Sequence, residues 1–288
     1  DKNEVLPLNK SEKIALIGPF GDTRGLVGPW GGKCDRNDCD TLLEVFKKEG
    51  YDVNYALGCD ILGKYYNLEE VLEASKDCDT IVFACGENEH MSGEAASRAM
   101  LTLPGRQEEM LRELSRLGKK LVLCIHAGRP LVLREYRNLC DSILYCWFLG
   151  TMSSKAICDT LYGINNPSAK LTMSFPYTVG QVPVYYNCLN TGRPYEKDNF
   201  YCSRYMDIPN EPLYPFGYGL SYSKFSYSNL KIENKQIKKN DTIKVSVEIK
   251  NESNVAGYET VQLYIEALSF SVARPVLELK GFKKLWFE

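Results

Sequence analysis

Short apolar runs alternate with segments of helical spacing between residues 13 and 163, and this alternation constrains the fold more than any other feature. The predicted strands occupy residues 13–18, 51–58, 80–86, 120–126 and 142–148. Segments with apolar residues every three or four positions occupy residues 40–50, 68–78, 105–118 and 153–163, and a shorter helical stretch lies between the last two runs. Continuous apolar strands that alternate with helices are typical of a parallel sheet covered on both faces. The sequence therefore predicts an α/β fold with a mostly parallel sheet, and we expect Ser153 or Ser154 to cap the last helix.

The pattern changes twice further along the chain. Residues 164–224 are rich in proline, glycine and tyrosine, which indicates an ordered connection rather than a flexible Gly/Ser linker. From residue 225 the apolar residues recur at every second position, as they do in antiparallel strands, in segments at 225–233, 242–251, 257–267 and 278–288. These segments predict a partial antiparallel β-sandwich, because a complete one usually has about seven strands. We expect domain boundaries that give an α/β unit at 1–176, a connection at 177–216 and a β unit at 217–288 that is cut short.

Charge and hydropathy exclude two classes of partner. The formal net charge is −2, so the basic surplus that nucleic-acid phosphates require is missing. The apolar runs fall well short of the roughly 20 residues of a membrane-spanning helix. We expect neither a nucleic acid nor a membrane as partner.

The eleven cysteines indicate reduced thiols rather than a disulfide framework. Their number is odd, and several of them lie inside apolar runs, where cysteine behaves as a small hydrophobic residue. Cys34 and Cys39 have the wrong spacing for a zinc knuckle, which disfavours a metal site there. For the intact protein we expect no metal and no cofactor. The cysteines favour a cytoplasmic location, and three Asn-x-Ser/Thr triplets are weak evidence for secretion or a periplasmic location instead.

Function in an open parallel sheet gathers at the carboxyl ends of the strands, and the loops at 19–33, 86–100 and 126–130 qualify. The first is glycine-rich but matches neither the dinucleotide nor the Walker pattern, because Val27 and Cys34 occupy two positions that the Walker motif requires. We therefore rank phosphate binding below a structural role. Asp22, Arg24 and Trp30 are candidate contacts to a sugar or to a partner domain.

The second loop, "GENEHMSGEAASR", concentrates groups that can exchange protons. Glu87, Glu89, His90, Glu94 and Arg98 lie within residues 86–98. From the residues alone a purely structural role is favoured, in which Ser92 caps a short helix and Glu94 lies in its first turn. Glycoside hydrolysis needs two facing carboxyl groups, and spacing identifies no second one. Serine-type catalysis is disfavoured, and His126, at the end of an apolar run, is interpreted as a satisfied structural histidine.

Several motifs in sequence order resemble those of glycoside hydrolase family 3, in its bacterial β-glucosidase and β-xylosidase branch. The segments are "SGEAASRAMLTLPGRQEEML" (92–111), "AGRPL" (127–131), "NPSAKLTMSFPYTVGQVPVYYN" (166–187), "TGRPY" (191–195), "RYMDIPNEPLYPFGYGLSYSKF" (204–225) and "RPVLELKGFKK" (274–284). The resemblance covers essentially the whole chain. It implies an α/β sandwich domain followed by a fibronectin type III-like domain, with the family's N-terminal (β/α)8 barrel and its aspartate nucleophile outside this chain.

The resemblance also implies roles for individual residues. Glu94 matches the position of the family's general acid/base, and Glu87, Arg98 and His90 are candidate supporting residues. Asp22, Arg24 and Trp30 are candidates to face the substrate or the barrel. One departure is Ala127, where the family often has Asn before Gly-Arg-Pro. We also expect an exposed aromatic patch that includes Trp30 and tyrosines of 185–201, and a mobile loop at 87–100.

Taken as a whole, the sequence predicts the C-terminal part of a retaining, exo-acting β-glycosidase that removes terminal β-linked glucose or xylose. The chain on its own is expected to be inactive. Two alternatives stay open at this point: a carbohydrate-binding or scaffold module without chemistry, and a flavodoxin-like phosphate binder.

Overall fold

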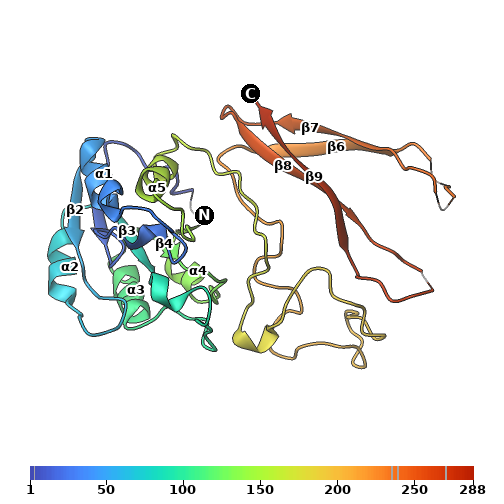
Figure 1. Ribbon diagram of the computed structural model, residues 1–288, viewed down its shortest axis with the longest axis horizontal. Helices are drawn as coiled ribbons and strands as arrows, with labels where there is room; N and C mark the ends of the chain where they lie inside the picture. The colour runs from blue at the N-terminus through green and yellow to red at the C-terminus, as the bar shows by residue number, and fades with distance from the viewer. Residues whose placement is uncertain (3, 235, 239, 270) are drawn as a thin grey trace.

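The computed structural model describes residues 1–2, 4–234, 236–238, 240–269 and 271–288 (Figure 1). A parallel sheet with its helices forms one side of the molecule, and two antiparallel hairpins form the other. The predicted fold class is confirmed. The exact domain boundaries stay predictions.

The parallel sheet is built from the apolar runs identified in the sequence. Its strands are β1 (Ile14–Ile17), β2 (Val53–Ala56), β3 (Thr80–Gly86), β4 (Lys120–His126) and β5 (Ser142–Tyr145). They lie in the order β2-β1-β3-β4-β5, and each neighbouring pair is parallel. The chain adds β2 on one side of β1 and then β3 on the other side. The topological switch point, where ligands bind in such sheets, therefore lies between β1 and β3.

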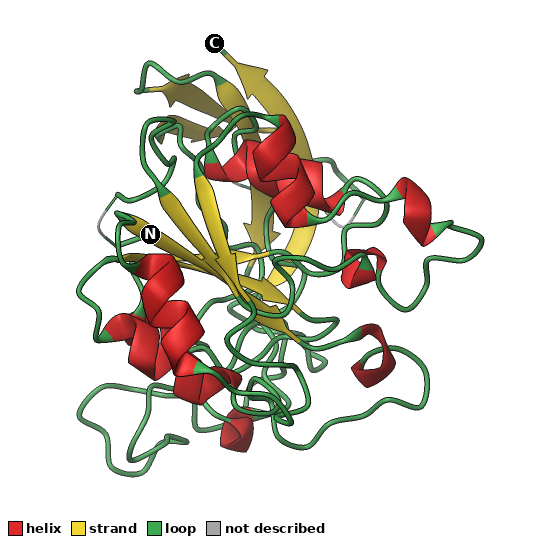
Figure 2. Ribbon diagram, turned by 90° about the vertical axis from the view of Figure 1, so that its left-hand side faces the viewer, coloured by secondary structure: helices red, strands yellow, loops and turns green. Residues whose placement is uncertain are grey.

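Helices cover both faces of the sheet, as the alternation predicts (Figure 2). They are α1 (Leu42–Lys48), α2 (Leu68–Ser75), α3 (Gln107–Ser115), α4 (Tyr136–Leu139) and α5 (Ser153–Leu161). Helices α1 and α5 pack on the face that Leu16 enters, and α2, α3 and α4 pack on the face that Ile17 enters. Consecutive strand residues thus feed two separate apolar cores, because side chains alternate across a strand.

The predicted serine cap of α5 is wrong. Helix α5 begins after Met152 without a side-chain cap. The Ser153 hydroxyl donates to the carbonyls of Leu26, at 3.1 Å, and Gly150, at 2.6 Å. The Ser154 hydroxyl donates to the Asp40 carbonyl, at 2.7 Å. Both hydroxyls therefore hold the segment between β1 and α1 against α5, a long-range role that a local cap pattern cannot reveal.

Residues 164–224 connect the two parts and are ordered by pairing with themselves. Leu171 donates to Tyr218, and Phe175 and Tyr214 exchange backbone hydrogen bonds. Phe175 is buried in the core on the α3 side of the sheet. A single turn of 3-10 helix, η4 (Val179–Gln181), leads into an excursion of the chain over residues 183–212. The connection is therefore packed against the α/β part at one end.

Two hairpins complete the chain. Strand β6 (Phe225–Ile232) pairs with β7 (Val245–Asn251), and β8 (Gly257–Ile265) pairs with β9 (Glu278–Phe287), each antiparallel. The Tyr227 hydroxyl donates to Glu259 at 2.8 Å and so joins the hairpins.

Within the described residues the longest helices, α3 and α5, have nine residues each. None of the described helices is long and apolar enough to cross a membrane.

Candidate functional site

The loops that follow β1, β3 and β4 meet at the carboxyl edge of the sheet. Loop 19–33 follows β1 and loop 86–100 follows β3, so the two flank the switch point, and loop 126–130 lies next to them after β4. Contacts join all three loops. The three loops that the sequence analysis selected are therefore in contact with one another, while the roles of their residues stay predictions.

Glu87 anchors the base of loop 86–100. It directly follows β3, its backbone N–H donates to the His126 carbonyl at 2.7 Å, and its side chain is 0% exposed. A buried carboxylate is stable only when charged partners surround it. Arg98 and Arg129 supply that charge: Arg98 Nη1 lies 2.5 Å from Oε1, and Arg129 Nε lies 3.1 Å from Oε2.

The two arginines extend the anchor to the backbone of the loop. Arg129 Nη2 donates to the carbonyls of Met91 and Ala96. Arg98 Nη1 donates to the Thr102 carbonyl at 3.0 Å. The Glu87 carboxylate therefore fixes the start of the loop and, through the arginines, both flanks of its tip at Gly93–Ala95. These contacts argue against the mobility expected for loop 87–100. We call Glu87, Arg98 and Arg129 the buried clamp.

Glu94 lies at the tip and is exposed. Its side chain has no hydrogen bond or ion pair with any of the residues that the structure describes. Gly93 has a φ of 101°, and a Cβ at this position would lie 3.2 Å from Nε1 of Trp30. Trp30, 72% exposed, therefore lies directly beside the tip.

The alternative in which Ser92 caps a helix is wrong. Ser92 instead ends a turn of 3-10 helix, η3 (Glu89–Met91), and residues 93–100, all described, contain no helix. Ser92 is buried because Gly128 lies against it: a Cβ at Gly128 would come within 1.8 Å of Ser92 Oγ. The glycine of "AGRPL" thus allows loop 126–130 to pack against loop 86–100.

The other candidates of the sequence analysis occupy different surroundings. His90 is exposed and lies 3.6 Å from Glu89, which also pairs with Arg36. Arg24 is engaged within the chain, where Nη2 lies 2.7 Å from Glu44 Oε1 of α1, and this pairing raises the pKa of Arg24. Asp22 is exposed.

The family model for the glycosyl hydrolase family 3 C-terminal domain matches residues 1–222, which include all three loops. The chain belongs to glycosyl hydrolase family 3. It is similar to the periplasmic β-glucosidase of Salmonella typhimurium, with 40% identity over 98% of this chain. It is also similar to a β-xylosidase of Formosa agariphila, with 36% identity over 98% of this chain.

A solved structure supports the same family. The β-glucosidase of Listeria innocua, in complex with gluconolactone, superposes over 100% of this chain with a TM-score of 0.93 and 38% identity. This chain covers 40% of the length of each of these three proteins. The cytoplasmic location of this chain stays a prediction, and one of the relatives is named as periplasmic.

Two residues that hold the candidate site together were missed in the sequence analysis. Arg129 was read only as part of "AGRPL". Gln107, in "LPGRQ", is 0% exposed; its Nε2 donates to the Gly86 carbonyl at 2.9 Å and its Oε1 accepts from the Gly86 N–H at 2.7 Å. Gln107 therefore ties the start of α3 to the end of β3. A polar residue that sits among apolar residues of a helical stripe is the signal that could have identified it.

The alternative of phosphate binding after β1 fits the geometry poorly. Helix α1 has a capping box: Thr41 Oγ1 accepts from the Glu44 N–H at 3.1 Å, and Glu44 Oε2 accepts from the Thr41 N–H at 2.8 Å. Its N-terminus is thus already satisfied by the chain's own side chains, one of them a carboxylate that would repel a phosphate.

His126 is buried, as expected, but not fully satisfied. It is 1% exposed, its ring lies 4.7 Å from the ring of Phe20, and Nε2 has no hydrogen-bond partner among the described residues. Burial lowers its pKa to about 4, against a weaker opposing effect of the Trp147 backbone. It is therefore neutral at physiological pH. The expectation that all its hydrogen-bonding groups have partners is wrong for Nε2 among the described residues.

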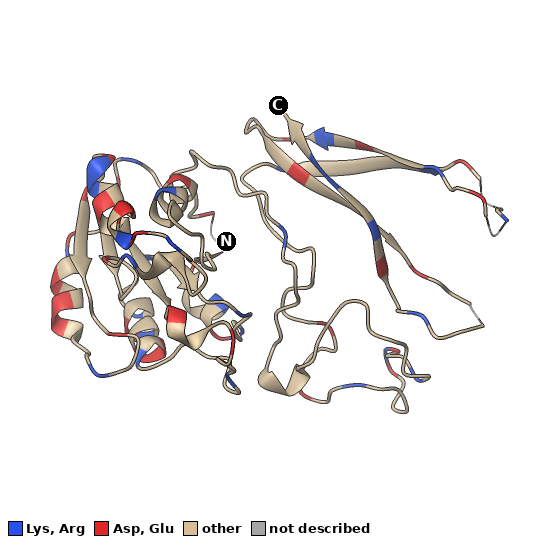
Figure 3. Cartoon of the chain, in the orientation of Figure 1, with Lys and Arg blue, Asp and Glu red and all other residues tan. Residues whose placement is uncertain are grey.

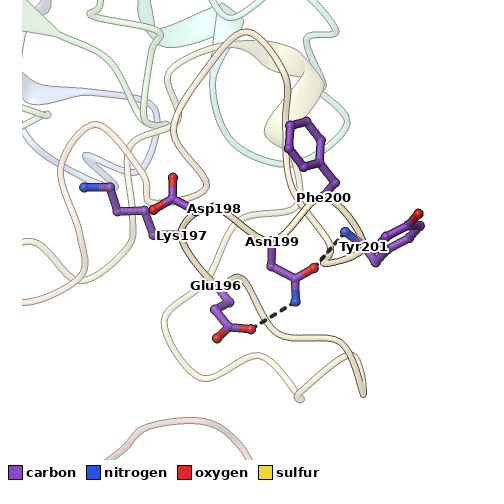
Figure 4. A pocket seen from close by; sticks show the side chains of 6 residues that line it. All are labelled: Glu196, Lys197, Asp198, Asn199, Phe200 and Tyr201. Atoms are coloured by element: carbon purple, nitrogen blue, oxygen red, sulfur yellow. Dashed lines mark hydrogen bonds between the residues drawn. The ribbon is translucent and has the colours of Figure 1, made fainter.

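Most of the aromatic side chains expected to be exposed are exposed, but Tyr186 is partly buried and stacks on Phe216, and the single patch stays a prediction. Besides Trp30 the exposed ones include Tyr185, Tyr195, Phe200 and Tyr201 in the excursion of the connection. A hollow of about 390 Å³ lies there, lined by Glu196–Tyr201 (Figure 4). None of the candidate site residues lines it, so we do not assign it to the site.

Acidic and basic residues are interspersed along the chain (Figure 3).

Proposed function

We propose that this chain is the C-terminal part of a β-glycosidase and supplies the general acid/base, Glu94. The nucleophile lies in an N-terminal (β/α)8 barrel outside the chain, and the substrate is a terminal β-linked glucoside or xyloside. The names of the relatives support the substrate class. In this proposal residues 1–176 form the α/β domain, 177–216 the connection and 217–288 a fibronectin type III-like domain.

The single observation that carries the proposal is the contrast within loop 86–100. Glu94 is exposed and without a partner among the described residues, while the loop on both sides of it is held by the buried clamp. A general acid that serves a site on another domain needs this combination: a carboxyl group open to that domain, on a backbone held in a fixed position.

The mechanism that we propose is retaining. The nucleophile attacks the anomeric carbon while Glu94 donates a proton to the leaving oxygen. In the second step Glu94 accepts a proton from the water that hydrolyses the glycosyl-enzyme. The two carboxyl groups must come within about 5–5.5 Å of one another in the assembled enzyme. In this proposal Trp30, which lies beside the tip, contacts the sugar or the barrel.

The test is Glu94→Gln in the full-length protein, with aryl β-glucosides of differing leaving groups. We expect kcat to fall by about 10²–10⁴-fold for a phenol-like leaving group, which needs protonation. The fall is smaller for 2,4-dinitrophenol, which leaves without a proton, and azide accelerates turnover and yields the β-glycosyl azide. The last result identifies the residue as the acid/base of a retaining enzyme.

Glu89→Gln is the matched control, because Glu89 lies on the same loop but pairs with Arg36. It should keep most of the activity. Equal losses in both variants, or near-normal activity of Glu94→Gln with poor leaving groups, contradict the assignment. We further expect residues 1–288 alone to hydrolyse no aryl β-glucoside; turnover that disappears with Glu94→Gln in this chain argues against a nucleophile outside it.

A further inference from the structure

Two thiols lie unusually close together in the segment between loop 19–33 and α1. The Sγ atoms of Cys34 and Cys39 are 3.6 Å apart, and Cys34 Sγ also lies 3.4 Å from the Thr151 hydroxyl. A short 3-10 turn, η2 (Arg36–Asp38), folds the chain back between them, and the Cys39 N–H donates to the Arg36 carbonyl at 3.1 Å. A disulfide bond is about 2.05 Å long, so small rotations of the side chains bring the sulfur atoms into bonding distance.

The two thiols differ in access to solvent, as the two partners of a thiol–disulfide exchange do. Cys34 is partly exposed, whereas Cys39 is 3% exposed. Burial, with a smaller contribution from Cys34, raises the pKa of the Cys39 thiol. Cys34 is therefore the thiol that an external reagent reaches first, and Cys39 is placed to resolve the product.

Another pair of cysteines shows why access matters. Cys124 of β4 and Cys146, which directly follows the neighbouring strand β5, both belong to the buried core on the α1 and α5 face of the sheet. Burial keeps an external reagent away from those two thiols, whereas Cys34 and Cys39 combine a short sulfur–sulfur distance with access to solvent at Cys34. Within the described residues these two belong to no group of His, Cys, Asp and Glu that could hold a metal ion.

We propose that Cys34 and Cys39 form a redox-modification site that closes to an intrachain disulfide in exchange with a low-molecular-weight disulfide such as oxidised glutathione. The Cys34 thiolate attacks one glutathione sulfur, which forms a mixed disulfide and releases one glutathione thiolate. The Cys39 thiolate then attacks the Cys34 sulfur and releases the second. Two protein thiols are oxidised, one glutathione disulfide is reduced to two thiols, and the two thiol protons pass to the glutathione.

The disulfide would stiffen a segment that touches the candidate site. Arg36, inside the closed ring, pairs with Glu89 of loop 86–100. The Cys39 carbonyl accepts a hydrogen bond from Arg24, which also pairs with Glu44 at the start of α1. Oxidation therefore links the cap of α1 more firmly to the loop that bears Glu94. The pairing of the thiols does not depend on the proposed function.

The test is peptide mapping of the full-length protein after equilibration with oxidised glutathione and alkylation of the remaining thiols. Trypsin cleaves after Lys33 and Arg36, so the two cysteines fall in different peptides, 34–36 and 37–47. We expect most of this material as a linked pair, lighter by two hydrogens than the sum of the free peptides, and we expect dithiothreitol to separate it. In Cys39→Ser, glutathione should stay bound to Cys34, whereas in Cys34→Ser residue 39 should stay unmodified.

Cys202→Ser is the matched control, because Cys202 is partly exposed but lies in the connection. It should leave the linked pair unchanged, and the core pair, in peptides 121–134 and 138–155, should stay unlinked. The proposal is overturned if the pair 34–36/37–47 is absent in oxidised glutathione, or if Cys34 is found linked to another cysteine. Hydrogen exchange of the backbone amides of residues 87–98 should slow on oxidation. Unchanged exchange overturns the inference that the disulfide stiffens loop 86–100.

Discussion

The same residue types occur twice at the carboxyl edge of the sheet, once buried and once exposed. Glu87 and His126 lie beneath loop 86–100, at 0% and 1% exposure. Glu94 and His90 lie on the loop itself and are exposed. The chain has no other histidine. The difference teaches that the buried pair is packed within the chain, whereas the exposed pair is open to groups outside it.

Backbone geometry sets the depth. Glu87 continues β3 and is still hydrogen bonded to β4, so its side chain stays in the layer of the sheet. Glu94 stands between Gly93 and Ala95, which have φ values of 101° and 59°. Two left-handed residues around one position form a tight turn that carries Glu94 away from the sheet.

The largest effect on stability is expected for the buried carboxylate. Glu87→Gln leaves Arg98 and Arg129 without their counter-charge, and breaking a buried ion pair from one side costs roughly 3–5 kcal/mol. We expect the lower end of that range, since both arginines retain some contact with solvent. Urea unfolding measures the change in the free energy of unfolding.

Glu94→Gln is the matched control for this prediction. A surface substitution away from structural contacts usually changes stability by no more than about 0.5 kcal/mol. We expect Glu94→Gln to lower the turnover of the full-length protein while its free energy of unfolding stays nearly unchanged. Similar unfolding free energies for the two variants would contradict the claim that Glu87 stabilises the fold while Glu94 does not.

The next largest effect concerns the buried histidine and pH. Its pKa is lowered to about 4 in the folded chain, so below pH 6.5 the unfolded chain binds a proton that the folded chain does not. Stability from this group is therefore lost as the pH falls from about 6.5 towards 4, by up to roughly 3 kcal/mol at 1.36 kcal/mol for each unit.

His126→Phe should flatten the dependence of the unfolding free energy on pH across this window, because phenylalanine can lie against Phe20 but binds no proton. His90→Gln is the control and should leave the pH dependence unchanged, since His90 is exposed in the folded chain. An equally steep loss of stability in His126→Phe would show that other groups cause it.

The positions of the strands could be predicted from the sequence more accurately than the conformation of the loops that follow them. The central strands β1, β3 and β4 are apolar runs, and their burial follows directly from composition and period. The position of Glu94 was identified through a resemblance, because the local pattern favoured a cap by Ser92. That pattern failed because Ser92 is held by Gly128, which lies 36 residues further along the chain and on another strand's loop.

Long-range partners also explain the other omissions. Arg129 binds Glu87 across 42 residues, and Ser154 binds Asp40 across 114. Cys34 and Cys39 were judged only as zinc ligands, because the spacing of two cysteines does not give the distance between their sulfur atoms. Such contacts form only when the sheet has brought distant segments together.

The smallest effect is expected at the backbone of the tip. A left-handed conformation costs an alanine roughly 1–2 kcal/mol, so Ala95→Gly removes strain from the folded chain. The greater freedom of glycine in the unfolded chain offsets about 0.4–1 kcal/mol of that gain. We therefore expect a small increase in stability, from near zero to about 1.6 kcal/mol, seen as a higher urea midpoint with an unchanged slope.

Ala96→Gly is the matched control, one position along, where the structure records no positive φ. It removes the same methyl group without relieving strain, so it should lower stability by roughly 0.5–1 kcal/mol. Opposite signs at adjacent alanines would establish that the turn holding Glu94 outward persists in solution. If both variants lose stability equally, Ala95 is not left-handed there, and the backbone account of why Glu94 is exposed fails while the buried clamp below it stands.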